Sequence, residues 1–184
     1  KLMVFASDFP SAFKEATAYG WALPKANRID WDFFSKKLNA EVSRLEGIYR
    51  NLLKNSGVQT FDQHAKVVDA HTIELASGKQ ITSEYILLAT GGKPDLPDIP
   101  GIDNVITSDQ VFSLSALPEK LLVVGGGYIA CEFSSIFNGF GSSVTQFCRS
   151  DTILRGFDVE ATSLVATQMK SNGIDLQFGV NVIK

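Results

Sequence analysis

Cysteine is scarce in this sequence, which has only Cys131 and Cys148 among its 184 residues. The two do not form a CxxC motif or another short redox pair, and they are too few for a disulfide-rich secreted scaffold. We therefore expect two inert, buried thiols in a reducing compartment, and neither a disulfide nor a metal site.

Long hydrophobic runs and a strong net charge are also absent. The longest apolar runs, such as YILLA and LLVV, are far too short to cross a bilayer, and the opening segment resembles no signal peptide. With a net charge of -3, the composition indicates no nucleic-acid or membrane partner, so any anion site must be local. These absences predict a cytoplasmic protein, and a start at Lys1 leads us to expect a truncated chain.

Helical periodicity dominates the first third of the sequence. Residues 1–20 predict a helix that could be interrupted at Pro10 and that ends near Gly20. After a loop that contains Pro24 and Asn27, Asp30 is placed to cap an amphipathic helix of about six turns that ends at Gly57. Its apolar stripe consists of Trp31, Phe34, Leu38, Val42, Leu45, Tyr49 and Leu52.

The middle of the sequence has a period of two, which is typical of strands. VQTF, AKVVDA, HTIEL and KQIT predict short strands with a turn at Ser77 and Gly78, in a small antiparallel β-meander. The apolar segment EYILLATGG predicts a strand buried on both faces of a parallel sheet. KPDLPDIPGIDN then predicts an ordered, extended connector between two domains.

After Pro118, predicted strands and helices alternate. KLLVV is expected to be a buried strand, followed by a glycine loop and helix in GGGYIACEFSSIFNGFG. SVTQFCR predicts a second strand, DVEATSLVATQMKSNG a helix that ends at Gly173, and IDLQF a third strand. The βαβαβ order is typical of the mononucleotide-binding half of a doubly wound α/β fold.

The glycine loop predicts a nucleotide site. Gly125, Gly127 and Ala130 match G-x-G-x-x-A, a weak motif that gains weight because it follows an apolar strand and opens a helix. Gly125 permits the tight turn, Gly127 lets the backbone approach a pyrophosphate, and Ala130 lets the helix lie close to the strand. Free N–H groups at the helix N-terminus would bind the phosphates. The alternative is a tight turn without a ligand.

The type of nucleotide depends on the end of the second strand. An NAD site carries an acidic residue about 20 residues beyond the glycines, but here Arg149 follows the strand and Arg155 lies nearby. Two guanidinium groups suit a ribose 2′-phosphate, so the predicted ligand is NADP(H). Two alternatives remain open: both arginines could be solvated surface charges, and Asp151 could serve as the ribose acid.

Tyr128 and Glu132 lie four residues apart at the start of the predicted helix and should share a face directed at the ligand. A tyrosine there could cover a ring, and a carboxylate could contact a carboxamide or a lysine. An equally good interpretation is an aromatic residue at the cap and an acid favoured by the helix dipole.

Several segments resemble the FAD-dependent pyridine nucleotide–disulfide oxidoreductases. They are GGGYIACE, LLATGGKPDLPDIPG, RSDTILRGFD and the long helix DWDFFSKKLNAEVSRLEGIYRNLL, and KLMVFAS is similar to the segment after the family's CxxxxCxPKK motif. The likeness covers essentially all 184 residues and is greatest to bacterial members that reduce glutathione disulfide. It implies parts of two Rossmann-like domains: residues 1–93 from the FAD-binding domain and 94–184 from the NADPH-binding domain.

The resemblance also implies site residues. In addition to Gly125 and Gly127, the implied NADPH contacts are Gly126, Ile129, Glu132, Arg149 and Arg155, with Tyr128 as a lid that moves when nicotinamide stacks on the flavin. The implied FAD neighbours are His64, Ala65, Thr90 and Gly91, and Tyr49 would lie near bound glutathione disulfide. From the residues alone, Tyr49 is equally placed for core packing, His64 for an ordinary strand position, and Thr90 and Gly91 for a strand end.

The implied parent enzyme is a homodimer, without nucleic-acid or membrane partners, that passes electrons from NADPH through FAD and a cysteine pair to glutathione disulfide. The family's cysteine pair and catalytic histidine are not in this sequence, so we expect the chain alone to be inactive. Alternatives are a sister reductase acting on trypanothione, thioredoxin or dihydrolipoamide, and a catalytically silent NADP(H)-binding module.

Overall fold

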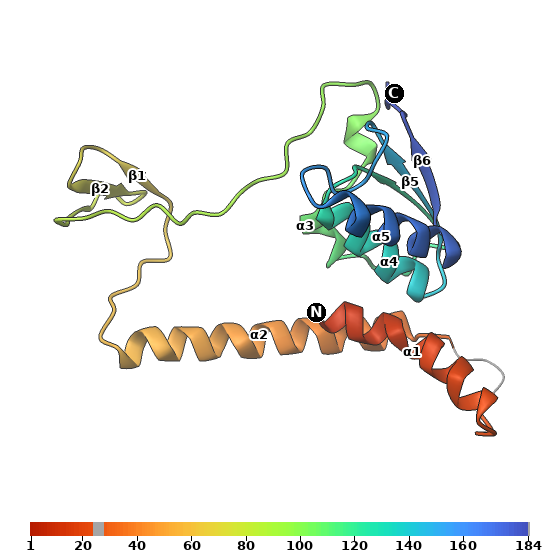
Figure 1. Cartoon of the computed structure of the whole chain (residues 1–184). Coiled ribbons are helices and arrows are strands. Elements are labelled where there is room, and N and C mark those ends of the chain that lie inside the picture. Colours follow the sequence, from red (N-terminus) through yellow and green to blue (C-terminus); the bar gives the residue numbers. More distant parts are fainter. Residues whose placement is uncertain (24–27, 184) are drawn as a thin grey trace. The chain divides into compact units, whose positions relative to one another are not determined.

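The structure is a computed structural model that describes residues 1–23 and 28–183. Pro24 and Asn27 of the predicted loop therefore lie outside the described residues, as does Lys184. The chain divides into two compact units (Figure 1): residues Lys1–Ala40 with Leu96–Lys184, and residues Glu41–Asp95. The first unit thus joins the N-terminal helical region to the C-terminal βαβαβ region.

A parallel sheet in the order β4-β5-β6 forms the base of the first unit. Its strands are β4 (Lys120–Val124), β5 (Ser143–Cys148) and β6 (Asp175–Phe178). Helix α4 (Tyr128–Gly139) connects β4 to β5, and α5 (Val159–Ser171) connects β5 to β6. Val124 pairs with Phe147 and Cys148 with Phe178, so the carboxyl ends of all three strands meet at one edge. The predicted βαβαβ order is confirmed.

The expectation that β4 is buried was wrong for one of its faces. The core lies between the sheet and the helices, and Phe137 of α4 and Val144 of β5 are almost completely buried there. Leu122 and Val124 are instead more than half exposed. β4 is an edge strand, and α4 is the only helix in substantial contact with it in the described part of the chain, so its other face stays open.

Helix α1 (Leu2–Ala18) runs without interruption through Pro10 and packs against α4. Proline costs about 3 kcal/mol inside a helix because it lacks an N–H group. Packing offsets this cost here, since Met3 and Ser7 are buried on the side of α1 that faces the core. Gly20, with φ 90°, follows the helix end as expected.

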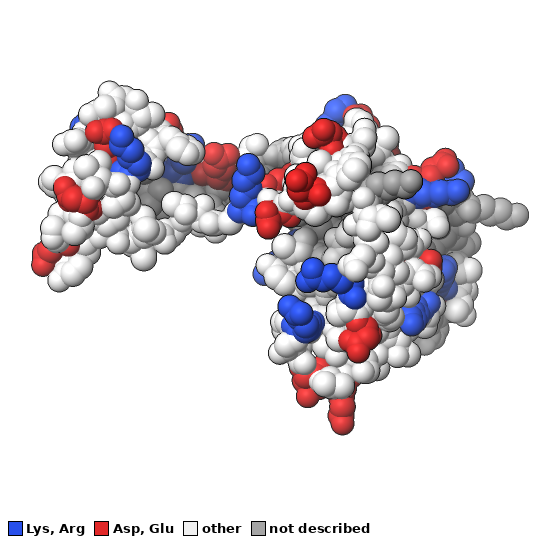
Figure 2. Space-filling model, turned by 90° about the horizontal axis from the view of Figure 1, so that it is seen from above, with Lys and Arg blue, Asp and Glu red and all other residues white. Residues whose placement is uncertain are grey.

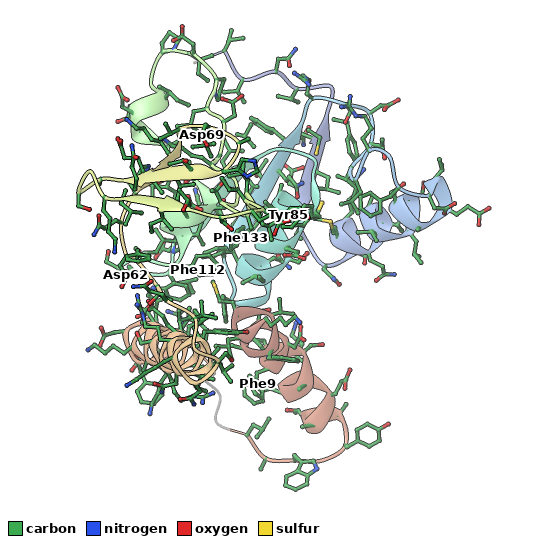
Figure 3. The ribbon with its side chains drawn as sticks, turned by 90° about the vertical axis from the view of Figure 1, so that its left-hand side faces the viewer. Phe9, Asp62, Asp69, Tyr85, Phe112 and Phe133 are labelled. Atoms are coloured by element: carbon green, nitrogen blue, oxygen red, sulfur yellow. The ribbon has the colours of Figure 1, made fainter. Side chains whose placement is uncertain are left out.

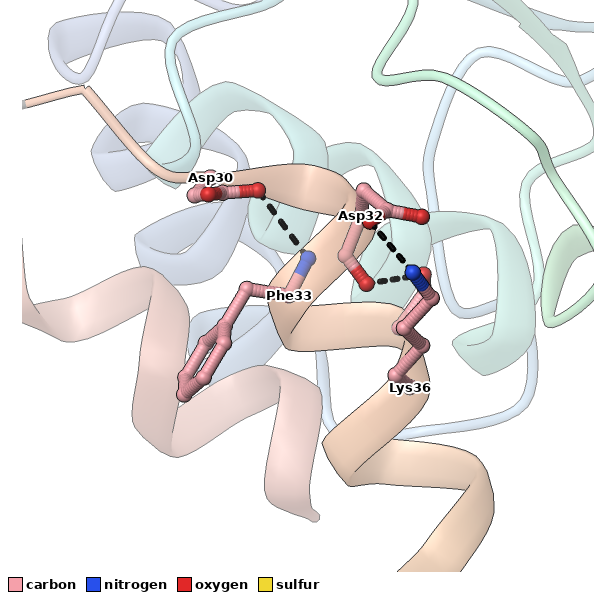
Figure 4. A network of polar contacts seen from close by, with 5 residues as sticks. Asp30, Asp32, Phe33 and Lys36 are labelled. Atoms are coloured by element: carbon pink, nitrogen blue, oxygen red, sulfur yellow. Dashed lines mark hydrogen bonds and ion pairs between the residues drawn. The ribbon is translucent and has the colours of Figure 1, made fainter.

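Helix α2 (Trp31–Asn55) begins as the sequence predicts. The Phe33 N–H group donates to Asp30 Oδ1 at 3.0 Å, and Lys36 pairs with Asp32 at 2.6 Å (Figure 4). The Trp31 indole donates to the carbonyl of Leu114 at 2.8 Å and fixes this end of α2 in the first unit. Only the beginning of the apolar stripe is buried, at Trp31 and Leu38, and the helix ends before Gly57.

Two short helical segments precede β4. They are η1 (Ile102–Asn104), which forms the last part of the proline-rich connector predicted over residues 93–104, and α3 (Ser108–Val111). Phe112, at the end of α3, packs edge-on against Phe133 of α4 with 5.8 Å between ring centroids (Figure 3). This contact ties the segment between the connector and β4 to α4, the helix that follows the glycine loop.

The second unit holds the predicted antiparallel meander. It consists of β1 (Ala65–Val67), β2 (Thr72–Leu75) and β3 (Gln80–Thr82) in that order. Gly78, with φ 81°, lies in the turn between β2 and β3, as predicted. An ion pair of 2.8 Å between Lys66 and Glu74 links β1 and β2.

Two strand predictions in this region were wrong. Residues 58–61 and 84–92 form no strand, and Leu87 is 89% exposed instead of buried. Tyr85 of the same segment is also exposed. A strand exists only where its N–H and C=O groups find a neighbouring strand. Neither segment has such a neighbour among the residues that the structure describes.

The surface carries charges of both signs, and the length and apolar character of the helices decide whether they could cross a membrane. Acidic and basic side chains both occur across the face shown in Figure 2. Within residues 1–23 and 28–183, none of the helices has the length and apolar character needed to cross a membrane.

The α1–α4 contact predicts a sensitive glycine. A Cβ at Gly139 would lie 2.6 Å from the carbonyl oxygen of Ser7, so Gly139→Ala must push the two helices apart. We expect a loss of about 1–3 kcal/mol, measured as a lower thermal unfolding midpoint. Gly47→Ala is the control in α2, where a Cβ has no described residue within 4 Å, and it should stabilise the protein by about 0.5–1 kcal/mol. An unchanged midpoint for Gly139→Ala would contradict this packing.

Candidate dinucleotide-binding site

The glycine loop, residues 125–127, lies at the carboxyl edge of the parallel sheet, between β4 and α4. Gly125 has φ 141°, a conformation that side chains disfavour and glycine adopts freely. A Cβ at Gly125 would lie 3.5 Å from the Cβ of Ala130, so small residues at both positions allow loop and helix to approach. The structure gives both residues the local roles that the sequence predicts.

Gly127 has a different reason to be glycine. Its φ of -83° suits any residue, and a Cβ there would have no atom of residues 1–23 or 28–183 within 4 Å. In the described part of the chain, no backbone hydrogen bond uses the N–H groups of Gly126, Gly127 or Tyr128. The first bond of the helix runs from Cys131 N–H to the Gly127 carbonyl at 3.1 Å. Free N–H groups, the positive end of a helix dipole and open space together suit a phosphate.

The segment after β5, residues 149–156, is attached to the glycine loop. We call this segment the arginine loop because it carries Arg149 and Arg155. The Leu154 N–H group donates to the Gly126 carbonyl at 2.6 Å, and Leu154 has φ 53°, which is uncommon for a residue other than glycine. Ser150 Oγ donates to the Thr152 carbonyl at 2.7 Å and shapes the loop from within.

A cavity of about 570 Å³ lies between the two loops. The glycine loop and Tyr128 line it on one side, and Arg149 and Arg155 line it with the apolar side chains of Phe147 and Leu154. Neither arginine forms an ion pair or a side-chain hydrogen bond within residues 1–23 and 28–183. Two uncompensated guanidinium groups beside a phosphate cradle can bind an additional phosphate. Asp151 does not line the cavity.

The cavity gathers six of the predicted NADPH residues and leaves two outside. Those that line it are Gly125, Gly126, Gly127, Tyr128, Arg149 and Arg155. Ile129 lies next on α4 and is exposed. Glu132 lines a second cavity of about 970 Å³ between α1 and α4, which Tyr128 also lines. Tyr128 and Glu132 therefore share a face, as predicted, although Glu132 lies on the second turn of the helix.

The residues predicted to contact FAD and substrate lie in the second unit, and none of them lines either cavity. The His64 carbonyl accepts a hydrogen bond from Ala76 N–H at 2.8 Å, and Ala65 begins β1. Thr90 and Gly91 belong to the unpaired segment 84–92, and Tyr49 is largely exposed on α2. Their roles toward FAD and glutathione disulfide stay predictions.

Sequence reasoning missed two residues that shape the site. Gln146 of β5 is 0% exposed and its amide Nε2 donates to the Gly125 carbonyl at 2.9 Å. A polar residue at a core-facing position of SVTQFCR was the available signal for it. The left-handed conformation of Leu154 left no signal, because leucine does not favour it.

Both cysteines are buried and free, as the sequence predicts. Burial raises the pKa of the Cys131 thiol and the pKa of the Cys148 thiol above the ordinary value. Thiols held in the protonated form are weak nucleophiles. The pair is therefore unsuited to thiol–disulfide exchange.

Comparison with known proteins identifies similar chains. The sequence matches the pyridine nucleotide-disulphide oxidoreductase family over residues 4–184. It is 46% identical over 158 residues to the chloroplastic/mitochondrial glutathione reductase of Pisum sativum, covering 86% of this chain and 28% of that protein. It is 38% identical over 183 residues to the glutathione reductase of Burkholderia cepacia, covering 100% of this chain and 40% of that protein.

A solved structure is similar as well. The HOCl-induced flavoprotein disulfide reductase RclA from Escherichia coli superimposes with a TM-score of 0.75 at 29% identity. The match covers 84% of this chain and 37% of that protein. The chain thus spans well under half the length of each protein compared.

Thiol burial predicts slow alkylation of Cys131 and Cys148. In the native protein at pH 8, both should react with iodoacetamide far more slowly than in guanidinium chloride, as followed by peptide mass spectrometry. Their raised pKa values favour folding fully below the ordinary thiol pKa of 9.0, and that contribution is lost as the pH rises through the folded-state values. Rapid native labelling of either thiol at pH 8 would contradict the burial described here.

Proposed function

The chain belongs to the pyridine nucleotide-disulphide oxidoreductase family, and we propose that the complete protein is an NADPH-dependent flavoprotein that reduces glutathione disulfide to glutathione. The observation that carries this proposal is the cavity that joins the glycine loop to Arg149 and Arg155. The choice of glutathione disulfide as substrate rests on the likeness to the glutathione reductases of Pisum sativum and Burkholderia cepacia, at 46% and 38% identity. Because the chain spans 28% and 40% of those proteins, the activity is assigned to the complete protein.

The cavity's residues fit NADPH. The N–H groups of Gly126, Gly127 and Tyr128 would hold the pyrophosphate, and the open space at Gly127 gives the phosphates room to approach. Arg149 and Arg155 would hold the ribose 2′-phosphate. Tyr128 is exposed at the start of α4, where its ring can cover the nicotinamide. Ile129 and Glu132 would complete the contacts from α4.

The other predicted ligands belong to the second unit. We propose that His64, Ala65, Thr90 and Gly91 contact FAD and that Tyr49 contacts glutathione disulfide. Gly91 has a left-handed φ of 73°, and a Cβ there would have no atom of the described residues within 4 Å, which leaves room for a cofactor. The support for these assignments is the family resemblance, which also assigns residues 1–93 to the FAD-binding domain and 94–184 to the NADPH-binding domain.

The chain's part in the reaction is to bind and align. NADPH would supply hydride and FAD would relay the electrons to a cysteine pair of the complete protein. Cys131 and Cys148 are not that pair, because both are buried and have raised thiol pKa values. The glycine loop and the arginine loop fix the dinucleotide, and the Tyr128 ring would exclude water from the nicotinamide face. We propose a cytoplasmic homodimer.

A second candidate is a flavoprotein reductase of a different disulfide. The likeness to the Escherichia coli flavoprotein disulfide reductase, with its TM-score of 0.75, favours this class without naming glutathione. NADPH oxidation by the complete protein with glutathione disulfide as acceptor separates the two. Turnover with glutathione disulfide supports the first candidate, and turnover only with other disulfides supports the second.

The arginine loop predicts a preference for NADPH over NADH, and substitution of either arginine should weaken that preference. Arg149→Ala and Arg155→Ala should each raise the KM for NADPH about 10- to 100-fold, because each removes a charge-assisted hydrogen bond to the 2′-phosphate. The KM for NADH should not change. Arg44→Ala, which removes an exposed arginine paired with Glu41 on α2, is the matched control and should leave both values unchanged. A wild-type protein that uses NADH and NADPH equally well would contradict the 2′-phosphate assignment.

A substitution at Gly127 distinguishes a phosphate-binding loop from a simple turn. Gly127→Ala should leave the unfolding midpoint unchanged, since its φ is ordinary and no atom in the described part of the chain lies near the added methyl group. NADPH binding should weaken by about tenfold or more because the methyl group occupies the space of the pyrophosphate. Calorimetric titration with NADP+ measures the change, with Gly47→Ala as the control. If the variant binds like the wild type, the loop is only a tight turn.

A further inference from the structure

A buried amide beneath the glycine loop is not explained by core packing. Gln146 lies on β5 between Val144 and Cys148, two core residues that point the same way along the strand. All three are buried, and Gln146 is the only polar one of the three. Its Nε2 lies 3.7 Å from Cys131 Sγ and 3.9 Å from Cys148 Sγ, so its surroundings are otherwise soft and weakly polar.

The amide is only half satisfied. Its Nε2 donates to the Gly125 carbonyl at 2.9 Å, but its Oε1 is buried and has no partner within the described part of the chain. A buried acceptor without a hydrogen bond destabilises the folded state. An apolar side chain of similar length would fill the same space without that cost. Core stability is therefore not the reason for a glutamine here, and the bond to Gly125 is its one strong contact.

That bond determines how the glycine loop presents its backbone. The Gly125 N–H group donates to the Phe147 carbonyl at 2.9 Å, and the Gly125 carbonyl also accepts from Cys148 Sγ at 3.6 Å. The next carbonyl, of Gly126, accepts from Leu154 N–H. The third carbonyl, of Gly127, accepts from Cys131 N–H. All three carbonyl oxygens of the loop are thus taken by donors of the protein, while the N–H groups of Gly126, Gly127 and Tyr128 have no partner among the described residues. An anion is repelled by carbonyl oxygens and attracted by N–H groups.

We propose that Gln146 is a positioning residue for the dinucleotide pyrophosphate. Its amide holds the Gly125 carbonyl beneath the loop, so that the loop offers the phosphates N–H groups and no oxygen atoms. The inference rests on the proposed NADPH function and adds to it a residue that never touches the ligand. Because the pyrophosphate is common to NADPH and NADH, the contribution of Gln146 is the same for both, unlike that of the two arginines.

The test uses the complete protein with Gln146→Met, which keeps the length of the side chain and removes its donor. We expect the KM for NADPH and the KM for NADH to rise by the same factor, about three- to tenfold, with kcat little changed. The unfolding midpoint should stay the same or rise, because the unpaired oxygen is gone. Gln146→Leu is a second variant in case the methionine disturbs folding, and it should behave in the same way.

Val144→Ala is the matched control from the same strand. It removes core packing without touching the Gly125 bond, so it should lower the midpoint and leave both KM values unchanged. Unchanged KM values in both Gln146 variants, whether or not the midpoint falls, would overturn the role of Gln146 and leave the proposed function intact. A wild-type protein that neither binds nor oxidises NADPH would overturn the proposed function and this inference together.

Discussion

The turn at Gly125, with its φ of 141°, is the constraint on which the rest of the candidate site depends. It takes the chain from the end of β4 into α4 within three residues and places the N-terminus of α4 at the carboxyl edge of the sheet. The turn is held from below by Gln146 and Phe147 and from the side by Leu154 of the arginine loop. A single backbone geometry thus sets both the phosphate cradle and the place of the arginines beside it.

Much of this site could be predicted from the sequence because its signals are local. Glycine spacing, the strand before it and the helix after it locate Gly125, Gly127 and Ala130, and the residue after β5 identifies Arg149. What the sequence could not give are contacts between residues far apart in the chain. The bond from Gln146 to Gly125, the bond from Leu154 to Gly126 and the approach of Gly139 to Ser7 have no counterpart in a local pattern.

The failed strand predictions have a related cause. Residues 84–92 and strand β4 carry the apolar pattern of strands buried on two faces, yet Leu87 and Val124 are exposed. The apolar pattern of a segment shows which of its faces could be buried. Burial also requires another element that packs against that face. Pro10 shows the opposite balance: its local signal against helix is outweighed by the packing of α1 on α4.

Tyr128 lines the cavity between the two loops and also the cavity between α1 and α4. Its ring is therefore part of two walls, and a ligand that turned the ring would change the shape of both cavities. The first turn of α4 thus contributes to two surfaces of the first unit and not only to the edge of the sheet.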